Sequence, residues 1–182
     1  WRGQSVSDWR LETTLHRESR RLGLPKIGTW ETTLFNDFVA QAPSRSDFID
    51  PRGSVPQWLV MMRHHGLPSR LLDWTWSPLI ASYFAVCDSN YLGSDGMLWA
   101  LDGAALNGAE GNGGLRSLQE LEGPVCDLVR APQKKGDQGA GGGKIFAAAG
   151  PHTTHRIARQ DGLFTIHGTD VPLDRHPRAS CC

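Results

Sequence analysis

The stretch HHGLPSRLLDWTWSPLIASYFA, from His64 to Ala85, decides most of the fold. Gly66 and Pro68 predict the end of a helix, because glycine suits the left-handed C-cap conformation and proline cannot continue a helix. Residues 70–75 are short and partly apolar, which predicts a largely buried extended strand. The Ser-Pro pair at 77–78 is typical of a helix start. The stretch therefore predicts a helix end, a strand and a second helix.

Two helices flank this strand. The first is expected to start near Pro56 and to reach His64 and His65 in its last turn. The second shows apolar residues at helical spacing, which predicts a face packed on the core. Those residues are Leu79, Ile80, Tyr83, Phe84 and Cys87.

The rest of the sequence predicts one α+β domain over residues 1–170, with small mixed or antiparallel sheets and helices packed on them. Gly-rich segments at 103–114 and 133–144 predict mobile loops, and residues 171–182 a polar tail. Helices are expected over residues 8–22 and 30–41, and strands near 1–5, 97–101, 125–129, 145–149 and 163–166.

Composition limits the function classes. The 182 residues hold 19 Lys plus Arg and 19 Asp plus Glu, so the basic excess of most nucleic-acid-binding proteins is missing. A local cluster at Arg10, Arg17, Arg20 and Arg21 reads either as a solvated helix face or as a basic patch. No apolar run is long enough to cross a bilayer, so no membrane partner is expected. Four cysteines without zinc spacing favour a reducing cytoplasm.

Asp73 stands out because it lies between apolar neighbours in the predicted strand. A buried carboxylate is costly unless it is paired or hydrogen-bonded. One interpretation is a structural network with Arg70 or with a more distant arginine. The other is a ligand pocket that Asp73 lines together with His65 and the hydroxyls of Ser69, Thr75 and Ser77.

Arg2 has the same ambiguity, since a guanidinium at a strand end can bind a phosphate or pair with a carboxylate. Gly3 would let a ligand or another chain approach the backbone. Trp1, Trp74 and Trp76 flank these polar groups and are better pocket candidates than the helix aromatics. A metal site built on His64, His65 and Asp73 is disfavoured, because adjacent histidines on a helix point in different directions.

The order of these pieces resembles the FRG domain family. Trp1-Arg2-Gly3-Gln4 resembles its Phe-Arg-Gly motif, with Trp in place of Phe, and Arg63 to Ala85 resembles its most specific run. Arg63 stands there in place of the usual Gln, and Ser69 in place of Thr. Further matches are Trp9, Leu11, Arg17, Glu31, Phe38, Asp95 to Asp102 and Arg156 to Phe164. The resemblance covers about residues 1–167.

The pattern is also similar, more weakly, to that of ADP-ribosyltransferase domains. This second resemblance implies an ADP-ribosyltransferase-like fold, in which Arg2 orients NAD and an aromatic ring stacks on nicotinamide. Gln160 lies near the place where most such enzymes use Glu to stabilise a cationic transition state, and Asp73 is the alternative acid. The residues expected to bind the dinucleotide are Arg2, Gly3, Gln4, His65, Arg70, Trp74, Thr75 and Ser77.

The resemblance thus implies an NAD-using enzyme that transfers ADP-ribose to a nucleic acid or protein, or hydrolyses NAD. The uncharged Gln160 keeps a second hypothesis open, a non-catalytic module that recognises a nucleotide or nucleic acid.

Overall fold

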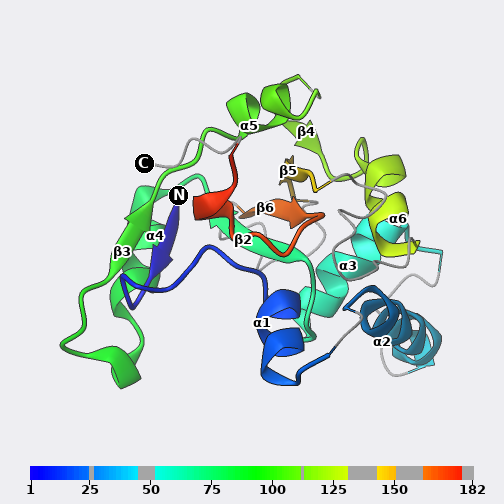
Figure 1. The fold of residues 1–182 in the computed structure, drawn as a ribbon, viewed down its shortest axis with the longest axis horizontal. Coiled ribbons are helices and arrows are strands. Elements are labelled where there is room, and N and C mark those ends of the chain that lie inside the picture. Colours follow the sequence, from blue (N-terminus) through cyan, green and yellow to red (C-terminus); the bar gives the residue numbers. More distant parts are fainter. Residues whose placement is uncertain (25–26, 45–51, 112, 131–142, 151–161, 178–182) are drawn as a thin grey trace.

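The computed structural model describes residues 1–24, 27–44, 52–111, 113–130, 143–150 and 162–177. Figure 1 shows a central sheet with helices around it and a second, smaller sheet at one side. In chain order the elements are β1 (Arg2–Gln4), α1 (Thr14–Arg21), α2 (Ile27–Gln41), η1 (Ala42–Ser44), α3 (Val55–His64), β2 (Leu71–Thr75), α4 (Pro78–Val86), η2 (Ser89–Tyr91), β3 (Met97–Trp99), α5 (Gly103–Ala109), β4 (Arg116–Ser117), α6 (Glu122–Arg130), β5 (Ile145–Ala149), β6 (Gly162–His167) and η3 (Leu173–Arg175).

The fold is α+β, as the sequence predicts. One sheet has four strands in the order β2-β6-β5-β4, and the other pairs β1 with β3. The pairs β2–β6, β5–β6 and β1–β3 are antiparallel, whereas β4 and β5 run parallel. The expectation of small mixed and antiparallel sheets is therefore confirmed.

The stretch around β2 folds as its sequence predicts. Gly66 follows α3 with a φ of 79°, a conformation that L side chains rarely adopt. The Ser77 side chain caps α4 by accepting a hydrogen bond from the backbone N–H of Ile80 at 3.3 Å. The strand Leu71–Thr75 lies between these two helix ends.

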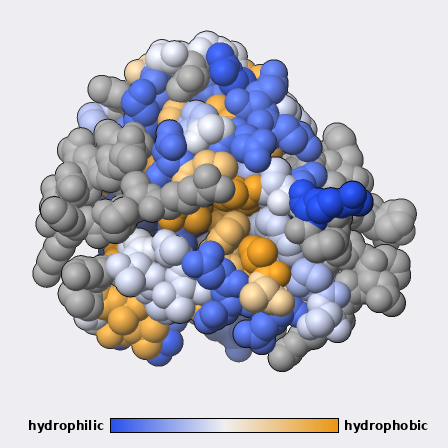
Figure 2. Space-filling model, turned by 90° about the vertical axis from the view of Figure 1, so that its right-hand side faces the viewer, coloured by the Kyte–Doolittle hydropathy of each residue, from blue (hydrophilic) through white to orange (hydrophobic). Residues whose placement is uncertain are grey.

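The four-stranded sheet has an apolar core on each face. Successive side chains of a strand point to opposite faces, so Leu71 and Phe146 pack with α3 and α6, whereas Leu72 and Ala147 pack near α5. Aromatic residues of α2, including Phe38, complete the first core. Figure 2 views the side of the molecule on which α2, α3 and α6 lie, where apolar residues are visible near the middle among polar ones.

The apolar stripe predicted for α4 is wrong. Leu79 is 79% exposed and Tyr83 is 63% exposed, while Ala81 is fully buried. The helix packs on β1 through its small residues, because a Cβ on Gly3 would lie 1.8 Å from the backbone oxygen of Ala81. Nearly every residue of α4 is apolar, so the pattern alone could not tell which face is buried.

Two further predicted segments differ from the structure. Residues 125–129, predicted as a strand, lie in α6, because a short apolar run fits a buried helix equally well. The loop predicted at 103–114 contains α5, which Asp102 caps by accepting from the Ala105 N–H at 2.9 Å. The loop predicted at 133–144 lies mostly outside the described residues.

The polar tail predicted over 171–182 contributes to the core in its first part. Leu173 is fully buried, and its N–H donates to the carbonyl of Leu11. The Asp174 carboxylate accepts from the Leu11 N–H at 2.9 Å and pairs with Arg10. The predicted helix over 8–22 starts only at Thr14, because Thr13 caps it. Among the described residues, no helix is long and apolar enough to span a membrane.

Candidate functional site

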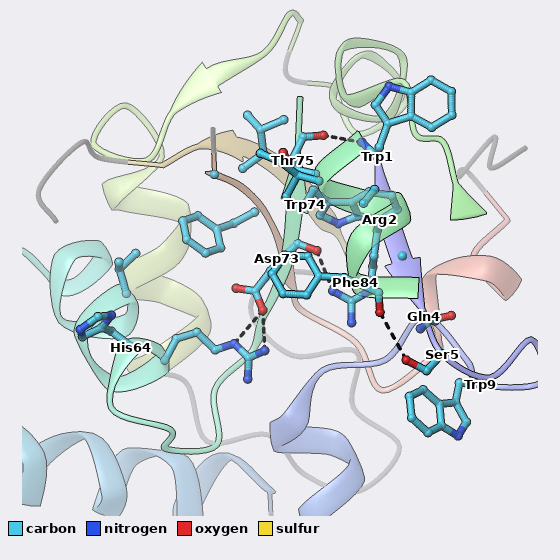
Figure 3. A pocket seen from close by; sticks show the side chains of 18 of the residues that line it. Trp1, Arg2, Gln4, Ser5, Trp9, His64, Asp73, Trp74, Thr75 and Phe84 are labelled. Atoms are coloured by element: carbon cyan, nitrogen blue, oxygen red, sulfur yellow. Dashed lines mark hydrogen bonds and ion pairs between the residues drawn. The ribbon is translucent and has the colours of Figure 1, made fainter. Parts of the chain in front are cut away.

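A cavity of about 540 Å³ opens where the carboxyl end of β2 meets the amino end of β6. Its walls come from β1, α1, α3, β2, α4 and β6, so segments far apart in sequence meet there. Figure 3 shows side chains from these elements around the cavity, with Trp1 and His64 on different sides of it. The volume is within the range of small-molecule sites in proteins.

Arg2 is a cation of this cavity that the backbone of β2 holds in place. Its Nη1 donates a hydrogen bond of 2.7 Å to the backbone carbonyl of Asp73, which fixes the guanidinium against β2 (Figure 3). Its Nε is buried and has no hydrogen-bond partner among the described residues. Burial lowers the pKa of Arg2 to about 10; Asp73 acts in the opposite direction, while Arg63 and Arg17 add to the lowering. The guanidinium therefore stays charged at neutral pH with a donor left to satisfy.

Asp73 is less buried than the sequence predicts. Its side chain is 44% exposed, because it lies on the α3-facing side of β2 beyond the apolar core. Its Oδ2 accepts hydrogen bonds from Nε and Nη2 of Arg63, the former at 3.0 Å. The pairing joins the last turn of α3 to β2, so the interpretation of Asp73 as part of an Asp–Arg network is correct, and the partner is Arg63.

Positive charge exceeds negative charge in this cavity. The guanidinium groups of Arg2, Arg17 and Arg63 face a single carboxylate among its described lining residues, that of Asp73. The Arg17 side chain is exposed and makes no hydrogen bond or ion pair within the described part of the chain. Since the chain as a whole carries no net charge, the local surplus makes this cavity attractive to an anion.

Aromatic rings border the charged groups. Trp1, Trp9, Trp74 and Phe84 all line the cavity. Trp74 is held in place, because its Nε1 donates to the hydroxyl of Thr165 at 3.0 Å. Phe84, expected to be a core residue, is 41% exposed and contributes to the wall. Rings beside cations are what a nucleotide requires, with stacking for its base and donors for its phosphates.

The structure divides the other residues expected at the site. Gln4 lines the cavity, yet its Oε1 accepts from the Trp99 indole N–H at 2.8 Å, so its main role is to join β1 to β3. Thr75 also lines the cavity, and its hydroxyl accepts from the backbone N–H of Ser77 at 3.1 Å. Ser77 is used as the α4 cap and is not among the lining residues. Gly3 is among the lining residues, and its lack of a side chain also lets α4 approach the backbone.

Arg70 lines neither of the two cavities described in this section. Its side chain is completely buried and forms an ion pair with Glu31 of α2, which is equally buried. It also donates to the carbonyls of His167 and Leu128. These partners use its donors, so Arg70 is a structural residue that ties α2, α6 and β6 together.

His65 and Ser69 also lie away from the cavity. His65 is exposed at the end of α3, against His64 and Phe38, while His64 lines the cavity instead. Ser69 is buried, and its carbonyl accepts from the backbone N–H of Leu15. Sequence reasoning missed the pocket roles of His64, Trp9 and Phe84. It placed Arg17 in a basic cluster, and both Arg17 and Arg63 among the residues that carry the family resemblance.

Gln160, the expected catalytic residue, lies outside the described residues. Within the part that is described, no group of three or more His, Cys, Asp or Glu side chains is arranged to hold a metal ion. The described lining of the first cavity offers arginines, Asp73 and aromatic rings.

A second cavity, of about 310 Å³, lies next to the first. Both cavities are lined by Trp1, Trp74, Leu163 and Phe164, so these residues form a shared wall. The second cavity extends toward α5, with Trp76 at its border.

The comparison with protein families tests the resemblance. The family model of the FRG domain matches residues 1–92, half of the chain. The chain belongs to the FRG domain family. Searches of the curated proteins and of the solved structures found no match.

The matched part of this FRG domain supplies most of the charged cavity. It runs from β1 to just beyond η2 and includes Arg2, Arg63 and Asp73. The β6 side of the cavity, including Leu163 and Phe164, lies beyond the match. The FRG motif and the run from Arg63 to Ala85 thus meet in space, because Arg2 donates to β2 and Gly3 packs on α4.

Proposed function

We propose that this FRG domain binds NAD or a related nucleotide in the first cavity and acts as an ADP-ribosyltransferase or an NAD glycohydrolase, with an ADP-ribosyltransferase-like arrangement of its strands. The observation that carries the proposal is the guanidinium of Arg2, held by the Asp73 carbonyl and left with an unpartnered Nε. A diphosphate in the cavity would pair with a guanidinium whose position the Asp73 carbonyl already fixes.

The aromatic wall supports the same proposal. Trp1, Trp9 and Phe84 offer ring faces within the cavity that holds the guanidiniums. A dinucleotide presents two rings and two phosphates, so it matches both features. A ligand with phosphate alone would leave the rings without a role, whereas an apolar ligand would leave the cations unpaired.

In the proposed reaction the bond between nicotinamide nitrogen and ribose C1′ breaks and nicotinamide leaves with the bonding electrons. A hydroxyl or amine of the acceptor, or water, forms the new bond to C1′ and loses its proton to solvent. The half-exposed carboxylate of Asp73 could stabilise the developing positive charge of the sugar, because its Oδ1 is not used by Arg63. Gln160 stays a candidate for orienting the ribose.

A second candidate function is recognition of a nucleotide without chemistry. The pairing of Asp73 with Arg63 favours it, since Arg63 neutralises the carboxylate that a transferase would use. Under this hypothesis the same cavity binds the same ligands, and only turnover is missing.

Calorimetry with ADP-ribose and an assay for released nicotinamide test the two parts separately. Arg2→Ala should weaken ADP-ribose binding by about tenfold or more, the typical loss of a charge-assisted hydrogen bond. Arg21→Ala is the matched control, because Arg21 is exposed on α1 and pairs with Glu18 away from the cavity lining. Nicotinamide release by the wild type supports the enzyme. Binding without release, with water and with nucleic-acid or protein acceptors supplied, supports recognition alone, and wild-type protein that binds no ADP-ribose rejects both.

A further inference from the structure

The second cavity differs from the first in its chemistry. Its described lining is almost entirely apolar or aromatic, with Trp76, Leu101, Leu115 and Ala147 among its walls. Its volume of about 310 Å³ is at the small end of the range for ligand sites, so it suits one ring system rather than a whole dinucleotide.

Three indole rings converge on this cavity from two neighbouring segments. Trp1 precedes β1, Trp74 lies in β2, and Trp76 follows β2. None of the three stacks on another ring within the described part of the chain. Trp76 is 61% exposed, an unusual loss of apolar burial for the largest side chain. The rings of Trp76 and of Trp1, which is 41% exposed, are therefore available to a planar ligand, whereas Trp74 is buried and forms part of the cavity wall.

The polar groups of the wall are already used. The Trp74 indole N–H donates to the Thr165 hydroxyl, which also lies 3.0 Å from Nε2 of His167. Asp102 carries the one charged side chain among the described lining residues, and its carboxylate caps α5. With no cationic side chain among those residues to offset Asp102, this cavity disfavours a phosphate and admits an uncharged ring.

We propose that the second cavity is a subsite for an uncharged nucleobase, stacked on Trp76 at its mouth. Its position beside the charged cavity gives it a role in the proposed nucleotide site, and to that extent the inference rests on the proposed function. The binding of a base to the tryptophans requires no phosphate and can be tested without it. The base would come either from the nucleotide in the first cavity or from a separate nucleic-acid strand.

Fluorine NMR of protein labelled with 5-fluorotryptophan tests the subsite residue by residue. The chain has seven tryptophans, and single Trp→Phe variants assign each fluorine resonance to its residue. Adenosine and uridine, which carry no phosphate, are the probes. We expect them to shift the resonance of Trp76 and at least one of Trp1 and Trp74. Trp30 and Trp58 are internal controls, because they lie in α2 and α3 away from both cavities.

Two variants of one exposed residue separate stacking from stability. Trp76→Ala should weaken adenosine binding by about tenfold, a typical loss for one base–aromatic stack. Trp76→Phe should keep most of the affinity, because a phenyl ring can still stack. Leu79→Ala, which removes an exposed apolar side chain outside both cavities, should change nothing.

Saturating ADP-ribose distinguishes the two sources of the base. If adenosine still shifts Trp76 in its presence, the subsite takes a base from a separate strand; if adenosine is displaced and ADP-ribose itself shifts Trp76, the nucleotide supplies the base. Both results support the subsite. The inference is overturned if millimolar adenosine and uridine leave Trp76 unmoved, or if Trp76→Ala binds adenosine as well as the wild type. A failure of ADP-ribose to bind would reject the proposed function and leave the nucleoside result as a separate measurement.

Discussion

Arg2 and Asp73 are joined through the backbone: the Nη1 of Arg2 donates to the carbonyl oxygen of Asp73 at 2.7 Å, although 71 residues separate them. The Asp73 carboxylate meanwhile points to Arg63. One residue of β2 thus positions two guanidiniums, one with its main chain and one with its side chain. Substitution of Asp73 should therefore release Arg63 without releasing Arg2.

Asp73→Asn should tighten the binding of ADP-ribose by roughly fivefold, because it removes a negative charge from a cavity meant for an anion. Nicotinamide release, if the wild type shows it, should fall, because the carboxylate that stabilises the sugar is lost. Calorimetry and the release assay give the two quantities separately. Weaker binding of ADP-ribose by this variant would contradict the conclusion that the surplus of positive charge in the cavity attracts the ligand.

Arg2→Lys should fail to replace arginine. A lysine keeps the charge but cannot donate to the Asp73 carbonyl and to a phosphate through one planar fork. We expect ADP-ribose affinity to lie near that of Arg2→Ala rather than near the wild type, by calorimetry. An affinity equal to that of the wild type would mean that charge alone binds the ligand.

Gly3→Ala should destabilise the fold by about 3 kcal/mol, the upper part of the range for overpacking, because its Cβ would meet the α4 backbone at Ala81. Urea unfolding followed by circular dichroism measures this. Gly108→Ala is the matched control: it lies within α5 with open space around it, so alanine there should add about 0.5–1 kcal/mol of stability. Equal effects at the two positions would show that the packing of β1 on α4 is looser than described.

Arg70→Met should cost about 3–5 kcal/mol in the free energy of unfolding, because it leaves the buried carboxylate of Glu31 without its partner. Arg21→Ala removes an exposed pair on α1 and should cost about 0.5 kcal/mol or less. Denaturant titration compares the two. A small loss at Arg70 would indicate that water reaches Glu31 in the folded protein.

Acid should destabilise the protein below pH 6.5. Burial, together with the charges of Arg70 and Arg20, lowers the pKa of His16 from 6.5 to about 3. Burial also holds the pKa of His167 well below its usual value. Between these pKa values the histidines bind protons in the unfolded chain but stay neutral in the folded one. Their contribution to the free energy of unfolding is therefore complete above pH 6.5 and declines as the pH falls toward 3.

The slope is measurable by urea titrations between pH 7.5 and 4.5. Each such histidine contributes about 1.4 kcal/mol per pH unit once the pH is below its unfolded pKa. His16→Gln should reduce the slope by the contribution of one histidine, whatever its effect on the free energy of unfolding at pH 7.5. An unchanged slope would mean that His16 is accessible to protons in the folded state.

Local signals predicted the elements best where a cap or a strong pattern was present. Gly66, the Ser77 cap and the strand Leu71–Thr75 are all where the sequence placed them, because these features act within a few residues. The exposed face of α4 could not be predicted, since its burial depends on the contact with Gly3 of a strand 78 residues before Ala81. Tertiary contacts, and not the periodicity of the sequence, therefore determine which face of α4 is buried.

The candidate site was predicted only in part, because local motifs indicate some of its residues and tertiary packing determines the others. Arg2, Trp74, Thr75 and Asp73 belong to strands with recognisable motifs, and all four line the cavity. Arg70 looked equally suitable, but its distance to Glu31 depends on how α2 packs, which no local pattern contains. Arg17 and His64 join the cavity through the packing of α1 and α3 on the same sheet.

The strand pairing has a consequence for the order in which the molecule can be made. Arg2 pairs with Trp99, and Leu71 pairs with Ile166. During synthesis β1 must therefore wait for β3, and β2 must wait for β6, before either has a partner. Helices α1 to α4 can form early from local contacts, but the cavity cannot close until the second half of the chain has left the ribosome. Pairing over such separations slows folding, so the first half should be the part most exposed to chaperones and proteases while the protein is being made.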